Sequence, residues 1–507
     1  MALPDWLDPL YVAEEMGATD TWAMSHGGVP SLELMERAAI GLARVVGEQA
    51  GEGPIRVVVG PGNNGGDGLA TARLLREDGR EVDVVAVAPL EKLAGDAREN
   101  LDRLPGDPPR ERLEGVGAKD LEGSGVVVDA MLGTGFAGAP RAAVAASIAA
   151  INALGAPVVA CDVPSGVDAS SGEVAGAAVE ATVTATFHGS KVGLHVAPGA
   201  LHAGEVRPVA IGIPRGAPAP AEAGLIAARV LDLVPRRTRG GSKFTSGVVV
   251  VAGGGRGMTG APCMVAEAAQ RTGAGYVQVA VPASTELVIE LRLLEAMTVS
   301  LPEAEGAHVA EGAEHVIGLS ERAGAVVVGP GLGRTEGAQE FARVLAREVE
   351  APVLLDADGL NAHAGRLEDL AKRHGPTVLT PHAAELGRLL GCDPDEVSAH
   401  RLASVREAAE RSGAVVLLKG DDTLVAVPGG PVAVSPGASA ALATAGTGDV
   451  LSGVIATLMA KGSEAFLAAA TGVLAHGRAG TLAGERIGAD HVIASDVIAA
   501  LPAAFSR

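Results

Sequence analysis

IRVVVGPGNNGGDGLATARLL, residues 55–75, joins an apolar β-branched run to an Ala- and Leu-rich helical pattern through a turn rich in glycine. A strand that leads into a helix in this way is the repeating unit of a parallel α/β sheet, and free N–H groups at such a turn favour an anion, typically a phosphate. The spacing, however, fits neither G-x-G-x-x-G nor G-x-x-x-x-G-K-[ST]. Asn63, Asn64 and Asp67 stand where phosphate-binding turns usually have small neutral residues. The turn is therefore either a tight βα turn without a ligand or a phosphate-binding turn in which a cation or hydrogen-bond donor offsets the charge of Asp67.

The same alternation of Val- and Ile-rich runs with Ala-rich stretches continues through all 507 residues. Continuous apolar strands separated by helices predict parallel sheets covered on both faces. In the first half of the chain, we expect strands at 55–60, 82–88, 125–132, 157–164, 182–187 and 205–213. In the second half, we expect strands at 247–254, 275–282, 325–331, 351–359, 376–381, 414–420 and 423–427. We expect helices at 31–49, with Ser31 as a plausible N-cap, and at 67–78, 92–104, 141–153, 449–461 and 464–483.

A proline-rich segment, IPRGAPAPAEAG (213–224), interrupts this alternation and suits a linker. We therefore predict two α/β domains, one over residues 1–215 and the other over 237–507, joined by a linker at 216–236.

Composition excludes several classes of protein. The formal net charge of −21 argues against nucleic-acid binding, which needs clustered Lys and Arg, and only 2% of residues are aromatic. No apolar run is long enough to cross a membrane, and the N-terminus lacks the basic start of a signal peptide. Cys161, Cys263 and Cys392 are too far apart for a zinc site and are expected to be buried thiols. We expect a cytoplasmic protein.

Two further predicted strand ends carry polar side chains: DAMLGTGFAG (129–138) and DVPSGVDASSG (162–172). Because ligands of open parallel sheets bind at the carboxyl ends of the strands, Asn64, Asp129, Asp162 and Ser165 are expected to converge there. Oxygen ligands of mixed charge suit a hard cation. Each aspartate alone is more often a turn former, and only their joint occurrence favours a site.

These stretches, with GNNGGDGLATAR (62–73) and TFHGSKVGL (186–194), resemble the N-terminal domain of NAD(P)H-hydrate epimerases in the same order. The resemblance implies a Rossmann-like three-layer αβα sandwich that inverts C6 of a hydrated nicotinamide ring. It implies K⁺ held by Asn64, Asp129 and Ser165, and Asp162 and Lys191 as catalytic residues. Substrate contacts carried over by motif are Asn63, Asn64, Gly65, Gly66, Asp67, Gly133, Thr134, Gly135 and Asp162. The family usually has proline where Ser190 precedes Lys191, so an ordinary exposed lysine is the alternative.

In the second half, LATAGTGDVLSGVIATLMAKG (442–462) is the most specific pattern. Its glycines would expose backbone amides at a helix start, where they can stabilise a transferring phosphoryl group. Asp449 in the first turn could accept a proton from a substrate hydroxyl, although a simple N-cap is the alternative. In TPHAAELGRLLG (380–391), Glu385 could organise Mg²⁺ and its waters. KGDDTLVAV (419–427) and GPGLGR (329–334) add two strand-end turns.

This set resembles the ADP-dependent NAD(P)H-hydrate dehydratases of the ribokinase-like superfamily, together with AGGGRGMTGAP (252–262) and LDADGLN (355–361). The resemblance implies a ribokinase-like αβα domain that phosphorylates the C6 hydroxyl of the S-hydrate with ADP. Loss of phosphate then restores NAD(P)H, with AMP and phosphate as products. It places substrate contacts at Gly333, His382, Glu385, Arg388 and Asp449. It places nucleotide contacts at Lys419, Gly420, Thr423, Ala445, Gly446, Thr447 and Gly448. Asp421 departs from the family pattern, because a small residue is usual there.

The two halves make sense of each other, because ring hydration yields both C6 epimers and the dehydratase handles only one. We therefore expect a bifunctional repair enzyme with K⁺, Mg²⁺ and ADP, acting as a homo-oligomer on hydrated NADH or NADPH. ADP and ATP both remain candidates for the donor. The alternative is a small-molecule kinase of the same superfamily, of the hydroxymethylpyrimidine or sugar type, with a non-catalytic N-terminal scaffold.

Overall fold

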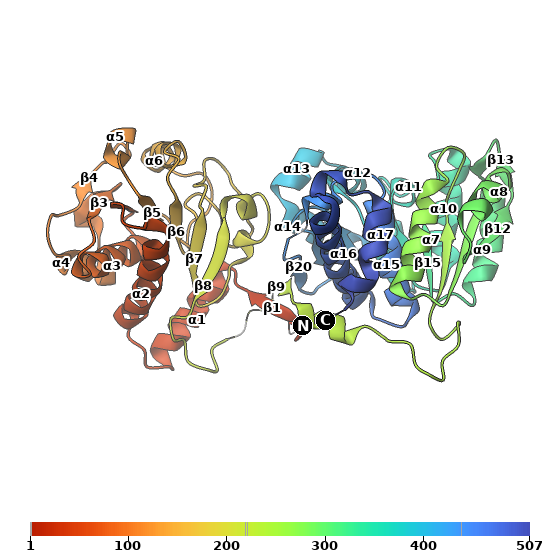
Figure 1. Ribbon diagram of the computed structural model, residues 1–507, viewed down its shortest axis with the longest axis horizontal. Helices are drawn as coiled ribbons and strands as arrows, with labels where there is room; N and C mark the ends of the chain where they lie inside the picture. The colour runs from red at the N-terminus through yellow and green to blue at the C-terminus, as the bar shows by residue number, and fades with distance from the viewer. Residues whose placement is uncertain (1–2, 219, 221, 438, 507) are drawn as a thin grey trace. The chain divides into compact units, whose positions relative to one another are not determined.

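In a computed structural model that describes residues 3–218, 220, 222–437 and 439–506, the strand of residues 55–59 lies between two parallel neighbours in its sheet, and the helix of residues 63–77 packs on one face of that sheet (Figure 1). The chain folds into two compact units: Pro9–Ala223, and Gly224–Arg507 together with Met1–Asp8. Both are α/β units, which confirms the predicted fold class. No helix of the described residues is long and apolar enough to cross a membrane.

The sheet of the N-terminal unit has seven strands within the described residues, all of them parallel to their neighbours, in the order β4-β3-β2-β5-β6-β7-β8. The strands are β2 (Ile55–Val59), β3 (Val82–Ala86), β4 (Arg110–Glu111), β5 (Val126–Ala130), β6 (Val158–Cys161), β7 (Val183–Phe187) and β8 (Glu205–Val209). The helices are α1 (Ala13–Ser25), α2 (Ser31–Ala50), α3 (Asn63–Glu77), α4 (Gly95–Asp102), α5 (Ala118–Leu121) and α6 (Ala142–Asn152).

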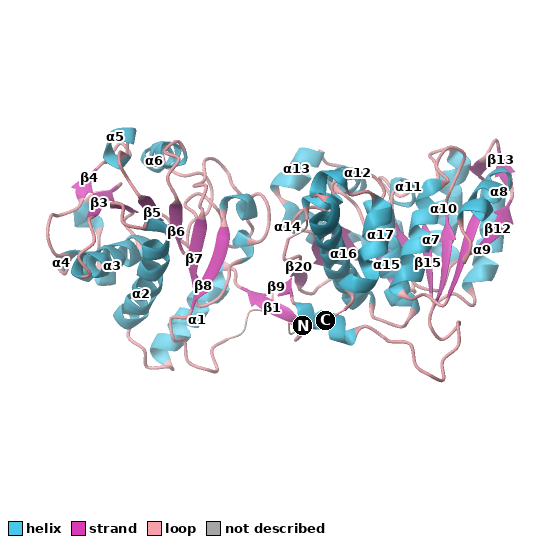
Figure 2. Ribbon diagram, viewed as in Figure 1, coloured by secondary structure: helices cyan, strands magenta, loops and turns pink. Residues whose placement is uncertain are grey.

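Helices cover both faces of this sheet (Figure 2). On one face, α2 and α3 pack on alternate strand residues such as Val57 and Val59, and on the other Ile148 and Ile151 of α6 pack against Val58. Because β-branched side chains alternate between the faces of each strand, these valine runs supply both cores.

The C-terminal unit contains a mixed sheet in which eleven strands of the described residues follow the order β1-β9-β20-β19-β18-β17-β16-β15-β10-β11-β12. From β18 to β12 neighbouring strands run parallel, whereas β18–β19 and β19–β20 are antiparallel. The strands are β1 (Leu7–Leu10), β9 (Ala223–Ile226), β10 (Val248–Ala252), β11 (Tyr276–Pro282), β12 (Met297–Leu301), β15 (Ala325–Val328), β16 (Val353–Leu355), β17 (Thr377–Leu379), β18 (Val415–Leu418), β19 (Leu424–Ala426) and β20 (Val432–Val434). A separate small ribbon consists of β13 (Glu303–Ala304) and β14 (Ala307–His308).

The helices of this unit fall into two groups. One group shares a large core with the sheet: α7 (Gly260–Thr272), α15 (Thr447–Ala460), α16 (Ala465–Ile487) and α17 (Ala494–Ala504). The others are α8 (Ala283–Arg292), α9 (Ala313–Ser320), α10 (Glu336–Glu348), α11 (Asp358–Asn361), α12 (Ala383–Leu390), α13 (Pro394–Ala399) and α14 (Arg401–Ser412).

Several local predictions need correction. Residues 3–8 belong to the C-terminal unit rather than to the unit of residues 9–215, because β1 pairs beside β9. The segment 216–236, predicted as a linker, contains β9 and the 3₁₀ helix Ala228–Leu233, which belong to the same unit. Ser31 is the first residue of α2, and Pro30 is the N-cap. Cys392 is only partly buried, whereas Cys161 and Cys263 are buried as expected.

Candidate active sites

A pocket of about 670 Å³ lies at the carboxyl ends of β2, β5, β6 and β7. These four strands are neighbours in the sheet, which is why motifs about 100 residues apart in sequence meet here. The pocket is lined by most of the predicted substrate residues and by the predicted catalytic Lys191: Asn63, Asn64, Asp67, Gly133, Thr134, Gly135, Asp162 and Lys191. Gly65 and Gly66 lie behind it instead, since a Cβ on Gly65 would stand 2.0 Å from the Gly60 carbonyl oxygen. Gly65 lets α3 start close to the strand end, whereas Gly66 lets α3 approach Met35 of α2 and Ala97 of α4.

Asp162 and Lys191 form a buried ion pair in this pocket. Asp162 follows β6 with a left-handed φ of 65°, which is uncommon for a residue other than glycine. Its Oδ1 accepts hydrogen bonds from the Lys191 Nζ and the Phe187 N–H, and its Oδ2 accepts one from the Thr134 hydroxyl. Burial raises the pKa of Asp162, but the charge and hydrogen bond of Lys191 outweigh it and leave that pKa below its usual value. Asp162 is therefore an ionised base.

Lys191 is only 1% exposed, so the alternative of an ordinary surface lysine is wrong. Its ammonium group also donates to the Thr186 hydroxyl at 3.0 Å and to the Phe187 carbonyl at 2.9 Å. With these bonds and the ion pair to Asp162, the lysine is fixed in one orientation.

The three predicted potassium ligands are brought together around Leu132. Asn64 donates its amide Nδ2 to the Leu132 carbonyl at 2.7 Å, and the Ser165 hydroxyl accepts from the Leu132 N–H at 2.9 Å. Ser165 in turn donates both its hydroxyl and its N–H to the two oxygens of Asp129, at 2.6 and 2.7 Å. Asp129 lies within β5, fully buried, and burial raises its pKa to about 6. A buried carboxylate among neutral oxygen atoms suits a monovalent cation, so these residues fit K⁺.

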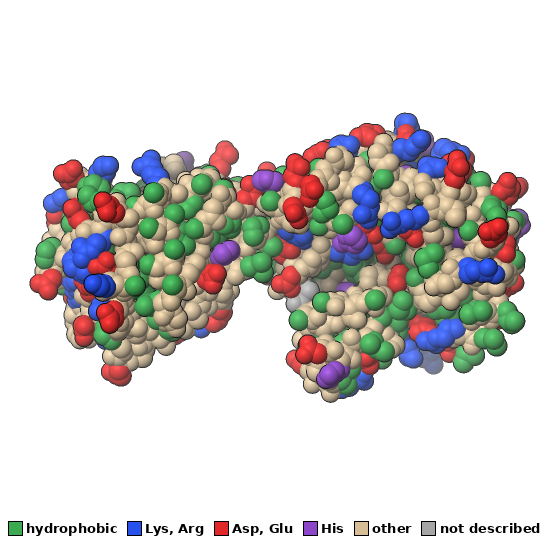
Figure 3. Space-filling model, turned by 90° about the horizontal axis from the view of Figure 1, so that it is seen from above, with side chains coloured by type: hydrophobic (Ala, Val, Ile, Leu, Met, Phe, Trp, Pro, Cys, Tyr) green, Lys and Arg blue, Asp and Glu red, His purple; other side chains and the backbone are tan. Residues whose placement is uncertain are grey.

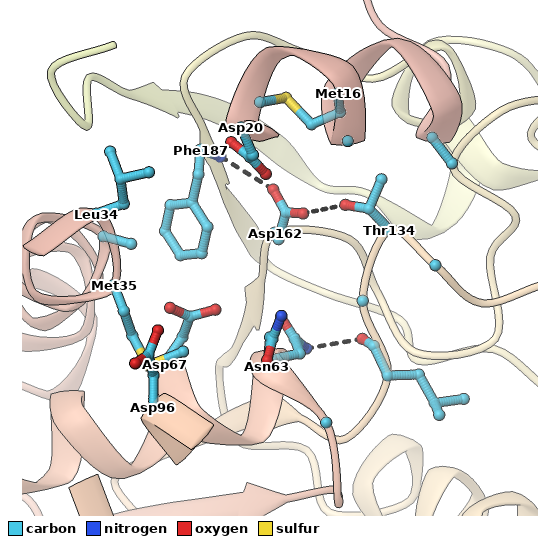
Figure 4. A pocket seen from close by; sticks show the side chains of 18 of the residues that line it. Met16, Asp20, Leu34, Met35, Asn63, Asp67, Asp96, Thr134, Asp162 and Phe187 are labelled. Carbon is cyan, nitrogen blue, oxygen red and sulfur yellow. Dashed lines mark hydrogen bonds between the residues drawn. The ribbon is translucent and has the colours of Figure 1, made fainter. Parts of the chain in front are cut away.

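Two acidic residues of the pocket were not assigned from the sequence: Asp20 of α1 and Asp96 of α4. They add to Asp67 and Asp162, and Figure 4 shows Asp20 beside Asp162, whose Oδ2 is bonded to Thr134. Burial, followed by the charges of Asp162 and Asp20, raises the pKa of Asp67 well above its ordinary value. No motif surrounds Asp20, and only its position on the inner face of α1 reveals it.

In the C-terminal unit, four predicted strand-end motifs follow β15, β16, β17 and β18, which are consecutive in the sheet. Asp449 lies in the first turn of α15, after Gly446, whose φ of 89° requires glycine. Gly446 and not Asp449 is the N-cap of α15, so the simple N-cap interpretation of Asp449 is wrong. Burial and the charge of Asp356 raise the pKa of Asp449 to about 7, against the opposing effect of Lys419.

Lys419 lies among carboxylates from three other elements. Its Nζ donates to Asp356 Oδ1 at 2.9 Å and lies 3.9 Å from Glu385 Oε2. Asp356, which follows β16, also accepts the hydroxyl hydrogen of Ser452 at 2.7 Å and is 2% exposed. Burial lowers the pKa of Lys419, but the charges of Asp356 and Glu385 raise it further, so the ammonium form is held. Sequence reasoning missed Asp356, although a carboxylate directly after a buried strand marks it.

The predicted hydrate-binding residues are joined by a hydrogen-bond chain. Gly333 donates its N–H to Asp358 at 3.0 Å, Asn361 donates to Asp358 at 3.1 Å, and Arg388 donates to Asn361 at 2.9 Å. His382 caps α12, where its Nδ1 accepts from the N–H of Glu385 at 3.3 Å. These contacts place the GPGLGR, LDADGLN and TPHAAEL segments at one edge of the sheet.

The predicted nucleotide-binding segments differ in how many of their polar groups already form hydrogen bonds or ion pairs within the protein. Thr423 donates its hydroxyl to the Gly420 carbonyl at 2.7 Å, and Thr447 donates to the Leu442 carbonyl at 2.9 Å. Both threonines therefore shape their turns. Asp421 is exposed, whereas its neighbour Asp422 pairs with Arg401 at 2.8 Å in the interior.

Ala445 is exposed before the start of α15, and Gly448 lies close to Lys419, since a Cβ on it would stand 3.5 Å from Nζ. On the face seen in Figure 3, acidic and basic side chains are interspersed and the C-terminal unit is hollowed.

Among the described residues, no cluster of three or more His, Cys, Asp or Glu side chains could hold a metal ion. Glu385 Oε2 accepts the His382 N–H at 2.9 Å and faces the Lys419 ammonium group. The indirect role of Glu385 toward Mg²⁺ and its waters therefore stays a prediction.

Comparison with known proteins agrees with both halves. Residues 249–503 match the family described as NAD(P)H-hydrate dehydratase, and residues 31–193 match the family described as YjeF-related protein N-terminus. The bifunctional NAD(P)H-hydrate repair enzymes Nnr of Moorella thermoacetica and Salinibacter ruber are each 38% identical to the chain. These alignments cover 97% of the chain, and 96% and 95% of the two relatives.

A crystal structure of ADP/ATP-dependent NAD(P)H-hydrate dehydratase from Bacillus subtilis, co-crystallised with ATP and Mg²⁺, is 28% identical, with a TM-score of 0.47. It covers 55% of this chain and 96% of that one. Identity to relatives over nearly the whole length decides the assignment: the chain belongs to the family of bifunctional NAD(P)H-hydrate repair enzymes.

Proposed function

We propose that the N-terminal pocket interconverts the R and S epimers of hydrated NADH and NADPH at C6, and that the C-terminal unit dehydrates the S epimer with ADP. The observation that carries this proposal is the ionised Asp162–Lys191 pair in one unit and the Asp449–Lys419–Asp356 cluster in the other. Each cluster lies at the carboxyl edge of its own parallel strands.

In the epimerase pocket, Asp162 acts as the base that accepts a proton at the C6 oxygen. It can do so because its pKa lies below the ordinary value, so the carboxyl group is ionised. Lys191 keeps this carboxylate ionised and fixed. K⁺, held by Asn64, Asp129 and Ser165, would supply a fixed positive charge beside the substrate phosphates. The N–H groups of the first turn of α3 would also favour the negatively charged phosphates, because a helix N-terminus favours an anion.

In the dehydratase site, Asp449 takes the proton from the C6 hydroxyl while the terminal phosphoryl group of ADP is transferred to that oxygen. A pKa of about 7 suits this task, because the group is then both available as a base and able to lose the proton again. The backbone N–H groups at Gly446–Gly448 and the ammonium group of Lys419 stabilise the charge on the transferring group. Phosphate then leaves C6 as a proton leaves C5, which restores the dihydronicotinamide ring.

The nucleotide donor is tested directly by product analysis. Purified protein is mixed with hydrated NADH, Mg²⁺ and either ADP or ATP, and regenerated NADH is followed by its absorbance. We expect AMP and phosphate from ADP in amounts equal to NADH. A stable phosphorylated small molecule without NADH would support the kinase alternative and refute the proposal.

We also propose self-association of the chain, since Leu287 and Leu291, one turn apart on α8, are 65% and 76% exposed. Exposed apolar patches of this kind commonly mark interfaces. Light scattering across a range of protein concentrations tests it: a homo-oligomer is expected, and a monomer at all concentrations would refute it.

A further inference from the structure

Asp20 is a carboxylate of the epimerase pocket that neither the motifs nor the family assignment accounts for. It belongs to α1, whose residues Met16, Gly17, Asp20 and Met24 line the pocket at helical spacing. Figure 4 shows its carboxyl group directed to the same region as Asp162. An acidic residue between two methionines on the inner face of a helix has little structural benefit, because burial penalises its charge.

The chain fixes α1 against the segment that carries Lys191. The Tyr11 N–H donates to the Ser190 carbonyl at 2.9 Å, and the Val192 N–H donates to the Tyr11 carbonyl at 3.1 Å. At the start of the helix, the Ala13 N–H donates to the Ser170 hydroxyl at 3.0 Å. The two bonds of Tyr11 join the start of α1 to the residues on both sides of Lys191. Backbone contacts therefore set the position of Asp20 relative to the Asp162–Lys191 pair.

Their surroundings shift the pKa values of the Asp20 and Asp162 carboxyl groups in opposite directions. Burial raises the pKa of Asp20 to about 6, with Lys191 lowering it and Asp162 raising it, whereas the pKa of Asp162 lies below its ordinary value. Asp67 of α3 also faces this region, and burial, followed by the charges of Asp162 and Asp20, raises its pKa well above the ordinary value. Two carboxyl groups whose pKa values are driven apart, as those of Asp20 and Asp162 are, can form an acid–base pair.

We propose that Asp20 is the general acid of the epimerase reaction and works with Asp162 as the base; the inference rests on the proposed epimerase function of this pocket. Asp20 gives its proton to the C6 hydroxyl as the C6–O bond breaks, and water leaves. The lone pair of the ring nitrogen forms the C6=N bond. A water molecule then adds to the opposite face of C6 and gives one proton to Asp162 Oδ2. A proton returns to Asp20 through solvent, and the net reaction only inverts C6.

The test compares Asp20→Asn, Asp20→Glu and, as matched control, Glu14→Gln, which removes an exposed charge from the same helix outside the pocket. Interconversion of the epimers is measured by chromatography without nucleotide, after the rate without protein is subtracted. Dehydration of the S-hydrate by the same chain normalises the amount of folded protein. We expect Asp20→Asn to lower kcat about 10²-fold or more with little change in KM, and Asp20→Glu to restore part of the rate.

A pH profile separates proton transfer from a merely structural role. In the wild type, kcat/KM for epimerisation should fall as pH rises through about 6, and this limb should be absent in Asp20→Asn. Wild-type kcat in Asp20→Asn, or an equal loss in Glu14→Gln, overturns the assignment of Asp20. Full activity in Asp162→Ala would instead overturn the proposed function of the pocket, so the two failures are distinguishable.

Discussion

Replacing Asp449 by asparagine removes the proposed base of the dehydratase without changing the shape of the side chain. A positioned general base contributes about 10²–10⁴ in rate, which corresponds to about 2.7–5.5 kcal/mol of activation free energy. We expect Asp449→Asn to lower kcat for NADH regeneration by at least about 10². Epimerisation by the same chain should be unchanged, since Asp449 lies in the other unit.

The pH dependence gives the sharper part of this prediction. Because the pKa of Asp449 is raised to about 7 and the base must be ionised, kcat/KM should increase with pH through about 7. At one unit below the pKa about a tenth of the sites are ionised, so the rate at pH 6 should be about tenfold below the plateau. Asp356→Asn removes a charge that raises this pKa and should move the inflection down, whereas Lys419→Met should move it up.

The assay is the initial rate of NADH absorbance with saturating ADP and Mg²⁺ between pH 5.5 and 9, with S-hydrate concentrations well below KM. Circular dichroism of each variant checks that the fold is kept. Near-normal turnover in Asp449→Asn, or an inflection that shifts the same way in Asp356→Asn and Lys419→Met, would refute the reasoning.

Three further predictions concern the epimerase unit. At pH 8 and equal ionic strength, the unfolding temperature of this unit should be higher in KCl than in NaCl. The difference should vanish as pH falls below about 6, because protons then compete with K⁺ for Asp129. An Asp129→Asn protein should show no difference between the two salts. Lys191→Met leaves the Asp162 carboxylate unpaired, so the pKa of Asp162 should rise and the epimerase unit should lose about 3–5 kcal/mol of stability, measured by urea unfolding; an unchanged midpoint contradicts the pairing. Gly65→Ala should lower the stability of this unit by about 1–3 kcal/mol, because its Cβ would meet the Gly60 carbonyl oxygen. Most of the epimerase activity should be lost while dehydration persists. Wild-type epimerisation in this variant would show that α3 can start elsewhere.

Sequence reasoning located both sites because their residues follow strands. Asn64 and Asp162 come just after apolar runs, and the order of parallel strands brings such positions to one edge. The same signal marks Asp356, but its motif served only for the resemblance. Asp129 lies inside β5 rather than after it, so its complete burial could not be anticipated from the pattern.

Other features depend on tertiary contacts that leave no local pattern. Asp20 has no distinguishing neighbours in the sequence, and only the packing of α1 over the pocket brings it to Asp162. The strand Leu7–Leu10 is too short to recognise, and its partner Ala223–Ile226 follows a proline-rich stretch. Long-range pairing of this kind overrides local propensity, so the domain boundary was placed by composition and not by contacts.

Repair of a mixture of both hydrate epimers tests the central claim, that one chain carries two complementary active sites. With ADP and Mg²⁺, the wild type should convert the whole mixture to NADH. Asp162→Ala should stop once the S epimer is consumed, apart from the slow rate seen without protein, and Asp449→Asn should equilibrate the epimers without producing NADH. Consumption of the R epimer at the wild-type rate by Asp162→Ala would contradict the account.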